Sequence, residues 1–309
     1  MTEWFPVRVG LRQGCVMSPW LFNVYIDGVV REVYARAGGA GVKFRDGWKV
    51  SQLLFADDTA LVADSEAELS ELVTEFARVC DRRKLKVNVG KSKVMRCSRE
   101  GIVGILDVRL NGEQLEEVEC FKYLGACITA SGGVEEDVCQ KVKAGHKAMG
   151  GMKQLFKCRR LQMSAKKRLY EGVVMPTVMY GSETWGLRET ERKRLNVFEM
   201  RCLRSMAGVT LMDRERNEVV RSRTGVETEL AKKVDKRVLG WFGHMERMDE
   251  RRLTKRVWRA EMSGKNARGR PRYGWTDGVN RAVHERSLTM DQARTSARDR
   301  AEWKRIVRN

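Results

Sequence analysis

The sequence predicts an α+β domain followed by a mainly α-helical, basic region. Its 42% hydrophobic residues can fill a core of ordinary size. Signals for a helix, a hairpin, a second helix and short strands succeed one another up to residue 130, which predicts an antiparallel sheet with helices. After residue 131 the strand signals stop and long helical patterns follow. We therefore expect three regions: 1–130, a helical 131–250, and a basic C-terminal 251–309.

The first expected helix lies in "GLRQGCVMSPWLFNVYIDGVVREVYARAGG". Ser18 can cap it, Pro19 suits the first helical position, and Gly38 with Gly39 ends it. The next stretch, "GVKFRDGWKVSQLLFADDTALVAD", holds two alternating segments around Asp57 and Asp58. This pattern predicts a hairpin whose tip is the acidic pair.

A second helix is predicted in "SEAELSELVTEFARVCDRRK", where Ser65 and Glu68 form a capping box. The segments "LKVNVGKSKVMRC" and "FKYLGACIT" are typical of short strands. Five further helices are expected, over residues 134–160, 164–180, 188–207, 213–223 and 227–247. Beyond Arg251 the pattern decays, because "GKNARGRPRYGW" is too rich in Gly and Pro for a helix.

The positive charge lies in the second half of the chain. The formal net charge is +19, and residues 1–130 balance 18 Lys and Arg against 18 Asp and Glu. Residues 131–309 carry 42 against 23. This asymmetry favours a working domain followed by a region that holds a polyanion, most commonly nucleic acid. The alternative is a cationic surface that only confers solubility.

The cysteines, histidines and apolar runs exclude several classes of protein. Eight cysteines occur without a Cys-x-x-Cys motif or a secretory signal, so we expect reduced intracellular thiols and no disulfide-linked partner. Three histidines lie at no ligand spacing, which argues against a zinc site. The longest apolar run, "GVVMPTVMYG", is too short to span a bilayer, so no membrane segment is expected.

The acidic pair has two interpretations on its own. Adjacent side chains of a flat strand point to opposite faces, so Asp57 and Asp58 can share an ion only if the chain turns between them. A hairpin tip supplies that turn. Two neighbouring anions on an apolar support need neutralisation, for which Mg²⁺ is well suited. The alternative is a solvated Asp-Asp turn.

Four segments in order resemble successive motifs of the reverse transcriptases of LINE-type, non-LTR retrotransposons. They are "GLRQGCVMSPWLFNVYIDGVV", "LLFADDTALVA", "LKVNVGKSK" and "FKYLG". "LGWFGHMERM" and "GRPRYGW" also resemble the region downstream of the polymerase core. The resemblance implies a partial polymerase palm over 1–130, a thumb or connection region over 131–250, and a basic tail. It implies RNA-directed DNA polymerase activity, an RNA template, a DNA primer or target, and a place in nucleus and cytoplasm.

The resemblance also implies roles for individual residues. Asp57 and Asp58 would bind Mg²⁺ or Mn²⁺ for nucleotidyl transfer. Lys91 or Lys93 would assist the leaving pyrophosphate; the sequence does not decide between them. The residues that would position template and nucleotide are Gln13, Gly14, Ser18 and Pro19, and those that would grip the primer are Phe121, Tyr123, Leu124 and Gly125. Each has a structural alternative: a loop contact, a solvated lysine or a core aromatic.

The resemblance also predicts that the catalytic centre is incomplete. In the family another catalytic aspartate lies on a strand upstream of the Gln-Gly motif, whereas residues 1–12 contain Glu3 and no Asp. Asp27 and Asp64 are substitutes only in principle. The fingers region and an endonuclease domain are also missing. We therefore expect weak metal binding and no polymerase activity from this chain alone, unless a complementing chain supplies the strand.

Two alternatives to an enzyme remain: a non-catalytic nucleic-acid-binding remnant that acts through the basic second half, and a translated relic without a selected role. Within that half, "RGRPR" resembles the core of an AT-hook, with arginines for a narrow minor groove. Similar segments occur at this place in the retroelement family. The residues concerned are Arg268, Arg270 and Arg272. The side chains that could stack on bases or else anchor local packing are Trp241, Trp258, Trp275 and Trp303.

Overall fold

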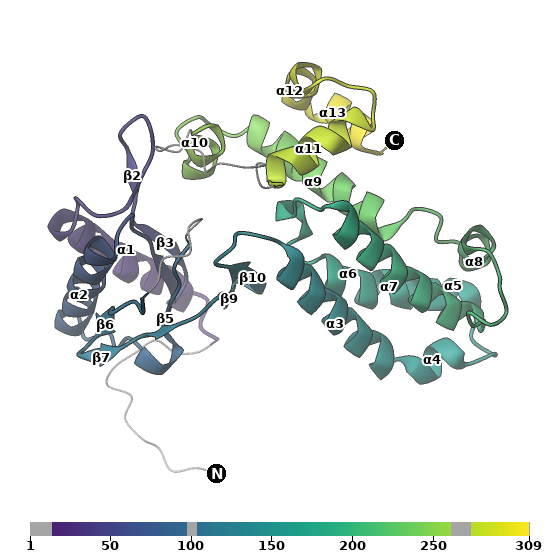
Figure 1. Ribbon diagram of the computed structural model, residues 1–309, viewed down its shortest axis with the longest axis horizontal. Coiled ribbons are helices and arrows are strands. Elements are labelled where there is room, and N and C mark those ends of the chain that lie inside the picture. The colour runs from purple at the N-terminus through teal and green to yellow at the C-terminus, as the bar shows by residue number, and fades with distance from the viewer. Residues whose placement is uncertain (1–13, 98–103, 261–272, 309) are drawn as a thin grey trace, which may run out of the picture. The chain divides into compact units, whose positions relative to one another are not determined.

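The computed structural model describes residues 14–97, 104–260 and 273–308 (Figure 1). The chain forms two compact units. The first comprises residues 1–118 with 260–266, and the second comprises 119–259 with 267–309. The first unit thus ends earlier than the boundary expected at residue 130. Consequently the hairpin in "FKYLGACIT" belongs to the helical second unit.

Two helices of the first unit pack together around one of its two core clusters. α1 (Ser18–Arg36) packs against α2 (Glu66–Arg82), and their shared core includes Val29, Leu72 and Phe76. The strands are short and occur in pairs. They are β1 (Val42–Lys43) with β2 (Lys49–Val50), β3 (Gln52–Phe55) with β4 (Asp58–Leu61), β5 (Lys93–Val94) with β8 (Glu116–Glu117), and β6 (Arg109–Leu110) with β7 (Glu113–Gln114). All pairs are antiparallel except β5 with β8.

The predicted start of α2 is confirmed, and that of α1 is wrong by one residue. Ser65 flanks α2 and its hydroxyl accepts a hydrogen bond from the amide of Glu68 at 3.2 Å. At α1 the flanking residue is Met17, no side chain caps the helix, and Ser18 is already helical. Proline in the first turn suits this start because its missing amide hydrogen would have no partner there.

The segment "LKVNVGKSKVMRC" is mostly not a strand, contrary to its alternating pattern. Residues 85–88 have no regular structure, and a 3-10 turn, η1 (Val89–Lys91), follows. The carboxamide of Asn88 accepts a hydrogen bond from the amide of Lys91 at 3.1 Å, which stabilises the turn instead of an extended chain. Only β5 remains extended.

The second unit begins with a hairpin and continues as helices. β9 (Cys120–Tyr123) pairs with β10 (Ala126–Thr129). The expected helices are found, with two of them divided. The helical elements are α3 (Glu135–Gly151), α4 (Lys153–Lys157), α5 (Met163–Leu169), the π-helix η2 (Tyr170–Val174), α6 (Met175–Met179), η3 (Ser182–Thr184), α7 (Glu189–Ala207), α8 (Asn217–Thr224) and α9 (Leu230–Glu246).

The C-terminal region is more structured than the decaying pattern predicted. Four more helices occur: α10 (Leu253–Arg259), α11 (Trp275–His284), α12 (Met290–Arg298) and α13 (Arg300–Arg308). All four contact α9. Trp303 of α13 is 3% exposed and donates a 2.8 Å hydrogen bond to the carbonyl of Leu239. The residues after 273 are therefore part of the fold of the second unit.

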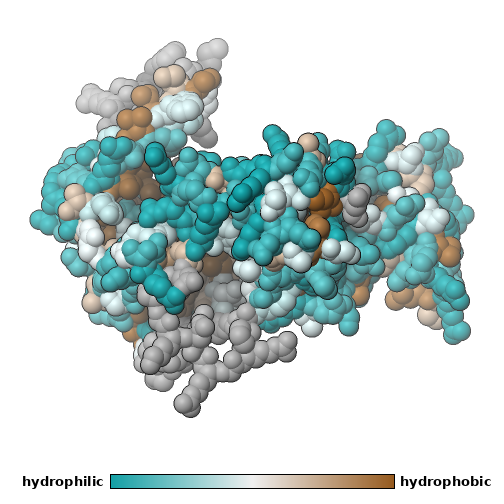
Figure 2. Space-filling view, turned by 90° about the horizontal axis from the view of Figure 1, so that it is seen from above, coloured by the Kyte–Doolittle hydropathy of each residue, from teal (hydrophilic) through white to brown (hydrophobic). Residues whose placement is uncertain are grey.

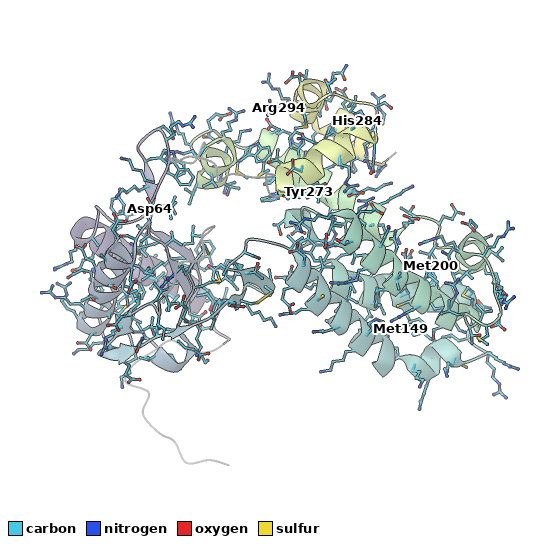
Figure 3. All side chains as sticks on the ribbon, viewed as in Figure 1. Asp64, Met149, Met200, Tyr273, His284 and Arg294 are labelled. Carbon is cyan, nitrogen blue, oxygen red and sulfur yellow. A yellow bond between two sulfur atoms is a disulfide. The ribbon has the colours of Figure 1, made fainter. Side chains whose placement is uncertain are left out.

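The core of the second unit joins α3, α7 and α9. Met200 on α7 belongs to it and Met149 on α3 packs against it; both are labelled in Figure 3. Gly145 permits the close approach of α3, because a Cβ there would lie 2.4 Å from Val178 and 2.6 Å from Phe198. Bulky side chains therefore fill the spaces that small residues leave.

Buried charges tie these helices together. Glu199 is fully buried and accepts hydrogen bonds from Arg221 at 2.7 Å and from the hydroxyl of Tyr170 at 3.2 Å. Burial, together with this carboxylate, raises the pKa of Tyr170. Asp235 binds Arg192 and Arg281, each at 2.7 Å. Because buried charges are costly unless paired, these groups fix how the helices pack.

On the face seen in Figure 2 hydrophilic side chains dominate, and hydrophobic ones lie in separate patches. In the part of the chain that the structure describes, no helix has both the length and the apolar character to cross a membrane.

Candidate functional site

The acidic pair lies at the predicted hairpin tip. Phe55 of β3 pairs with Asp58 of β4, which leaves Ala56 and Asp57 as a two-residue loop. Ala56 has φ 52, a positive value that in two-residue hairpin loops is normally adopted by Gly. The loop therefore holds its residues in a defined backbone geometry and places Asp57 directly before the strand that begins with Asp58.

Both carboxylates are open to solvent. Asp57 and Asp58 are exposed, and neither makes a hydrogen bond or ion pair with any residue that the structure describes. The expected apolar support is only partly buried, because Leu53 is 40% and Phe55 63% exposed. Two adjacent anions without a protein cation are free to bind an external one.

The donor chemistry of the pair fits a divalent cation that prefers oxygen, such as Mg²⁺. The coordination set is incomplete, however: within residues 14–97, 104–260 and 273–308 no three His, Cys, Asp or Glu side chains gather to hold a metal ion. Asp27 pairs with Arg31 at 2.8 Å, and Asp64 (Figure 3) accepts a hydrogen bond from the amide of Lys43 at 2.9 Å. Neither substitute is grouped with the pair.

The two candidate lysines differ in their surroundings. Lys93 on β5 pairs with Glu116 of β8 at 2.5 Å. Lys91 ends η1, is exposed, and makes no ion pair with a described residue. Of the two, Lys91 is the side chain whose charge is not already engaged.

The loop before α1 is only partly described. Gln13 lies outside the described residues, and Gly14 has φ 84, which favours Gly. Ser18 and Pro19 form the first turn of α1. The thiol of Cys15 lies against this turn, and hydrogen bonding to the backbone of Met17, with Ser18 contributing, lowers its pKa.

The first unit exposes two apolar surfaces. The first half of α1 leaves its large side chains in solvent, among them Trp20 at 70% and Val24 at 74% exposure. On β3 the exposed residues are Leu53 and Phe55, while the side-chain amide of the intervening Gln52 is buried without a partner. Exposed apolar surface of this kind is typical of places where another segment or protein packs.

The hairpin of the second unit carries the predicted primer-gripping residues. Leu124 and Gly125 form its loop with φ 49 and 80, the geometry of a type I′ turn. Cys120 and Cys127 lie on one face and form a disulfide (Figure 3). The expectation of reduced thiols is therefore wrong for this pair, because β9 and β10 bring the two Cα atoms to 6.3 Å.

Two buried charges that sequence reasoning missed hold this hairpin on the helical core. Asp137 of α3 is 5% exposed and accepts hydrogen bonds from the amide of Cys127 at 2.9 Å and the indole of Trp185 at 2.7 Å. Lys141 donates to the carbonyl of Gly125 at 2.5 Å and lies 4.7 Å from the ring centre of Tyr180. Their only sequence signal was charge at the start of a helix, which is typical of a solvated face.

The remaining candidates lie in the C-terminal region. Arg268, Arg270 and Arg272 fall outside the described residues. The indoles of Trp258 and Trp275 make an edge contact at 4.8 Å. Trp275 donates to the carbonyl of Glu183 and Trp258 to the carboxylate of Glu246. The tryptophans of α10, α11 and α13 therefore anchor local packing, one of the two expected alternatives.

Comparison with known proteins identifies the class to which the first part of the chain is related. Residues 2–128 match the family "Reverse transcriptase (RNA-dependent DNA polymerase)". This segment contains the acidic turn and all but one residue of the 120–129 hairpin. The matched segment is thus a reverse transcriptase segment, as its motifs predicted.

The relatives are products of mobile elements. The chain is 27% identical to a transposon-derived protein of Caenorhabditis elegans over 85% of this chain and 97% of that protein. It is 22% identical to the RNA-directed DNA polymerase from mobile element jockey of Drosophila melanogaster, over 69% of this chain and 23% of that polymerase.

A third relative is the Pol polyprotein from a type-1 retrotransposable element of Nasonia vitripennis, 27% identical over 57% of this chain and 43% of that polyprotein. The chain therefore spans less than half the length of these two polymerases. The recognition of a non-LTR retrotransposon reverse transcriptase is confirmed.

Proposed function

We propose that this chain supplies part of the nucleotidyl-transfer centre of an RNA-directed DNA polymerase. In that reaction a primer 3′-hydroxyl attacks the α-phosphorus of a nucleoside triphosphate, and pyrophosphate leaves. The supporting observation is the pair of unpartnered carboxylates at a defined hairpin tip, in a segment that matches reverse transcriptases. Asp57 and Asp58 would hold Mg²⁺ or Mn²⁺, which would stabilise the phosphate charge.

The proposed site takes further carboxylates from outside the described residues, because two-metal catalysis needs ligands for both ions. The exposed apolar faces of α1 and β3 are the surfaces on which such a segment would dock. The hairpin of Phe121, Tyr123, Leu124 and Gly125 would contact the primer. Gln13, Gly14, Ser18 and Pro19 would contact template and nucleotide, and Lys91 rather than Lys93 would face the pyrophosphate.

Primer extension tests this proposal. Purified chain 1–309 is incubated with an RNA template, a DNA primer, the four deoxynucleotides and Mg²⁺ or Mn²⁺. We expect no extension by this chain alone. Template-dependent extension that Asp57→Ala abolishes would show that the chain already contains a complete centre. Extension that Asp57→Ala leaves unchanged would exclude the turn from catalysis.

The second candidate function is binding of nucleic acid without chemistry, favoured by the 42 Lys and Arg against 23 Asp and Glu after residue 130. Counterion release predicts that such binding falls steeply with salt and does not depend on Asp57. The resemblance to retroelement reverse transcriptases implies a protein present in nucleus and cytoplasm, which microscopy of a fluorescent fusion would test.

A further inference from the structure

Residues 138–170 contain ten Lys and Arg side chains and not one Asp or Glu. Three of the ten are used within the fold. Lys141 donates to the carbonyl of Gly125, buried Lys166 to that of Met206 and Lys167 to that of Gly225. The other seven are exposed, and we call them the cationic corner: Lys143, Lys147, Lys153, Lys157, Arg159, Arg160 and Arg168.

No member of the cationic corner forms an ion pair or hydrogen bond with any residue that the structure describes. Other exposed cations, such as Lys193 and Arg201, also lack an acidic partner among the described residues, whereas several exposed arginines have one. Arg259 lies 2.7 Å from Glu250, and Arg294 lies 3.7 Å from Asp291. Because like charges repel, seven unpaired cations on neighbouring elements cost stability unless an external anion neutralises them.

The corner has a rigid support within the second unit. Lys143 and Lys147 are one turn apart on α3, and Lys153 and Lys157 are one turn apart on α4. Phe156, fully buried, fixes α4 against the core. Lys166 fixes α5 by its hydrogen bond to the last turn of α7. The cations of three successive helices and the turn between them are therefore presented by a packed framework.

We propose that the cationic corner binds the phosphate backbone of a nucleic acid without reading its bases. Lysine and arginine are the usual phosphate contacts. Phe156 is the only Phe, Tyr or Trp between 138 and 168, and it is buried, so the corner offers no such ring for stacking on bases. An anionic membrane is the poorer partner, because Leu155 is the only large apolar residue within 143–168 that is strongly exposed.

This inference deepens the proposed function, since a polymerase must hold its template and primer, but its test needs no catalysis. Fluorescence anisotropy measures binding of the 309-residue chain to a labelled duplex of random sequence at 50 to 200 mM salt. The variant carries Lys153→Ala, Lys157→Ala, Arg159→Ala and Arg160→Ala. The variant loses four phosphate contacts. Between the lowest and the highest salt concentration, the affinity of the wild type should therefore fall by a factor about 100 times larger than that of the variant.

The matched control removes four exposed cations that have acidic partners, by Arg31→Ala, Arg78→Ala, Arg259→Ala and Arg294→Ala. Its net charge equals that of the corner variant, so it should keep the wild-type salt dependence. If the salt dependence of binding falls as much in the control as in the corner variant, net charge and not the corner drives binding. Wild-type binding by the corner variant would overturn the proposal outright.

Two further arms separate the alternatives. Asp57→Ala should bind the duplex as the wild type does, whether or not the chain is a polymerase, and a loss of affinity there would assign binding to the acidic turn instead. Vesicles containing phosphatidylserine should bind much more weakly than the duplex, and equal binding would assign the corner to membranes. A double variant, Lys153→Gln with Lys157→Gln, should show half the change in salt slope.

Discussion

The indole nitrogen of Trp185 donates a 2.7 Å hydrogen bond to Asp137, and both residues are buried. The second oxygen of this carboxylate accepts the amide of Cys127 at 2.9 Å. One side chain thus joins the 120–129 hairpin, α3 and the segment before α7. Asp137 is one of the two buried charges, with Lys141, that hold the hairpin on the helices.

Replacing this carboxylate should therefore loosen the second unit. Asp137→Asn keeps one carbonyl acceptor for two buried donors, so one donor loses its partner. We expect the free energy of unfolding to fall by about 1 to 3 kcal/mol. Urea titration followed by tryptophan fluorescence measures this change. Glu136→Gln, in the same helical turn, is the control and should change it by less than about 0.5 kcal/mol.

Gly145 should tolerate no side chain. In Gly145→Ala the new methyl would lie 2.4 Å from Val178 and 2.6 Å from Phe198. Overpacking of this kind costs about 1 to 3 kcal/mol, and the helix propensity of alanine offsets only part of it. The urea midpoint should fall accordingly.

Gly150 provides the matched control on the same helix, because nothing lies within 4 Å of a Cβ there. Gly150→Ala should raise stability by up to about 1 kcal/mol. Equal effects of the two substitutions would mean that α3 does not approach α6 and α7 as closely as the structure shows.

The free thiols should differ in reactivity. Burial raises the pKa of Cys80 to about 11 and that of Cys202 to about 12. At pH 8 only about one Cys80 in a thousand is then the reactive thiolate. Hydrogen bonding near the start of α1 lowers the pKa of exposed Cys15. Alkylation at pH 8 followed by peptide mass spectrometry should label Cys15 first and leave the two buried thiols unlabelled until denaturant is added.

The disulfide makes a separate prediction with the same measurement. Cys120 and Cys127 should stay unlabelled in denaturant and react only after a reductant is added. Labelling of both in denaturant alone would show that the hairpin carries free thiols.

Substitution of the acidic turn should leave the fold unchanged. The side chains of Asp57 and Asp58 are exposed and make no hydrogen bond or ion pair with a described residue. Asp57→Ala and Asp58→Ala should therefore change the free energy of unfolding by less than about 0.5 kcal/mol. Thermal unfolding by circular dichroism tests this. A large loss of stability would mean that these carboxylates have partners within the protein, and not an external cation.

Local signals predicted much of the first unit. Ser65 with its apolar stripe fixed the start and face of α2, and the acidic pair was placed at a hairpin tip by alternation on both sides. The alternating pattern of "LKVNVGKSK" predicted a strand, and this prediction is wrong. The side chain of Asn88 accepts a hydrogen bond from the nearby backbone amide of Lys91, and hydrophobic alternation does not take such a competing bond into account.

Features that depend on contacts between distant residues could not be predicted from the sequence. The pairing of Cys120 with Cys127 follows from strand register, which cysteine count does not reveal. The helices after residue 273 bury alanines such as Ala282 and Ala293, whose small side chains give a faint periodic signal. Buried Asp137 and Glu199 looked like members of solvated helix faces until their partners, distant in sequence, were placed beside them.

The attachment of the last helices to α9 also dictates an order of events during synthesis. Trp275 bonds to Glu183 and Trp303 to Leu239, 92 and 64 residues earlier in the chain. While α13 is still being translated, its Trp303 cannot pack against Leu239 and Phe242. A nascent chain arrested before Trp275 would therefore expose apolar residues of α9 to chaperones, and the second unit reaches its final form only once α13 has left the ribosome.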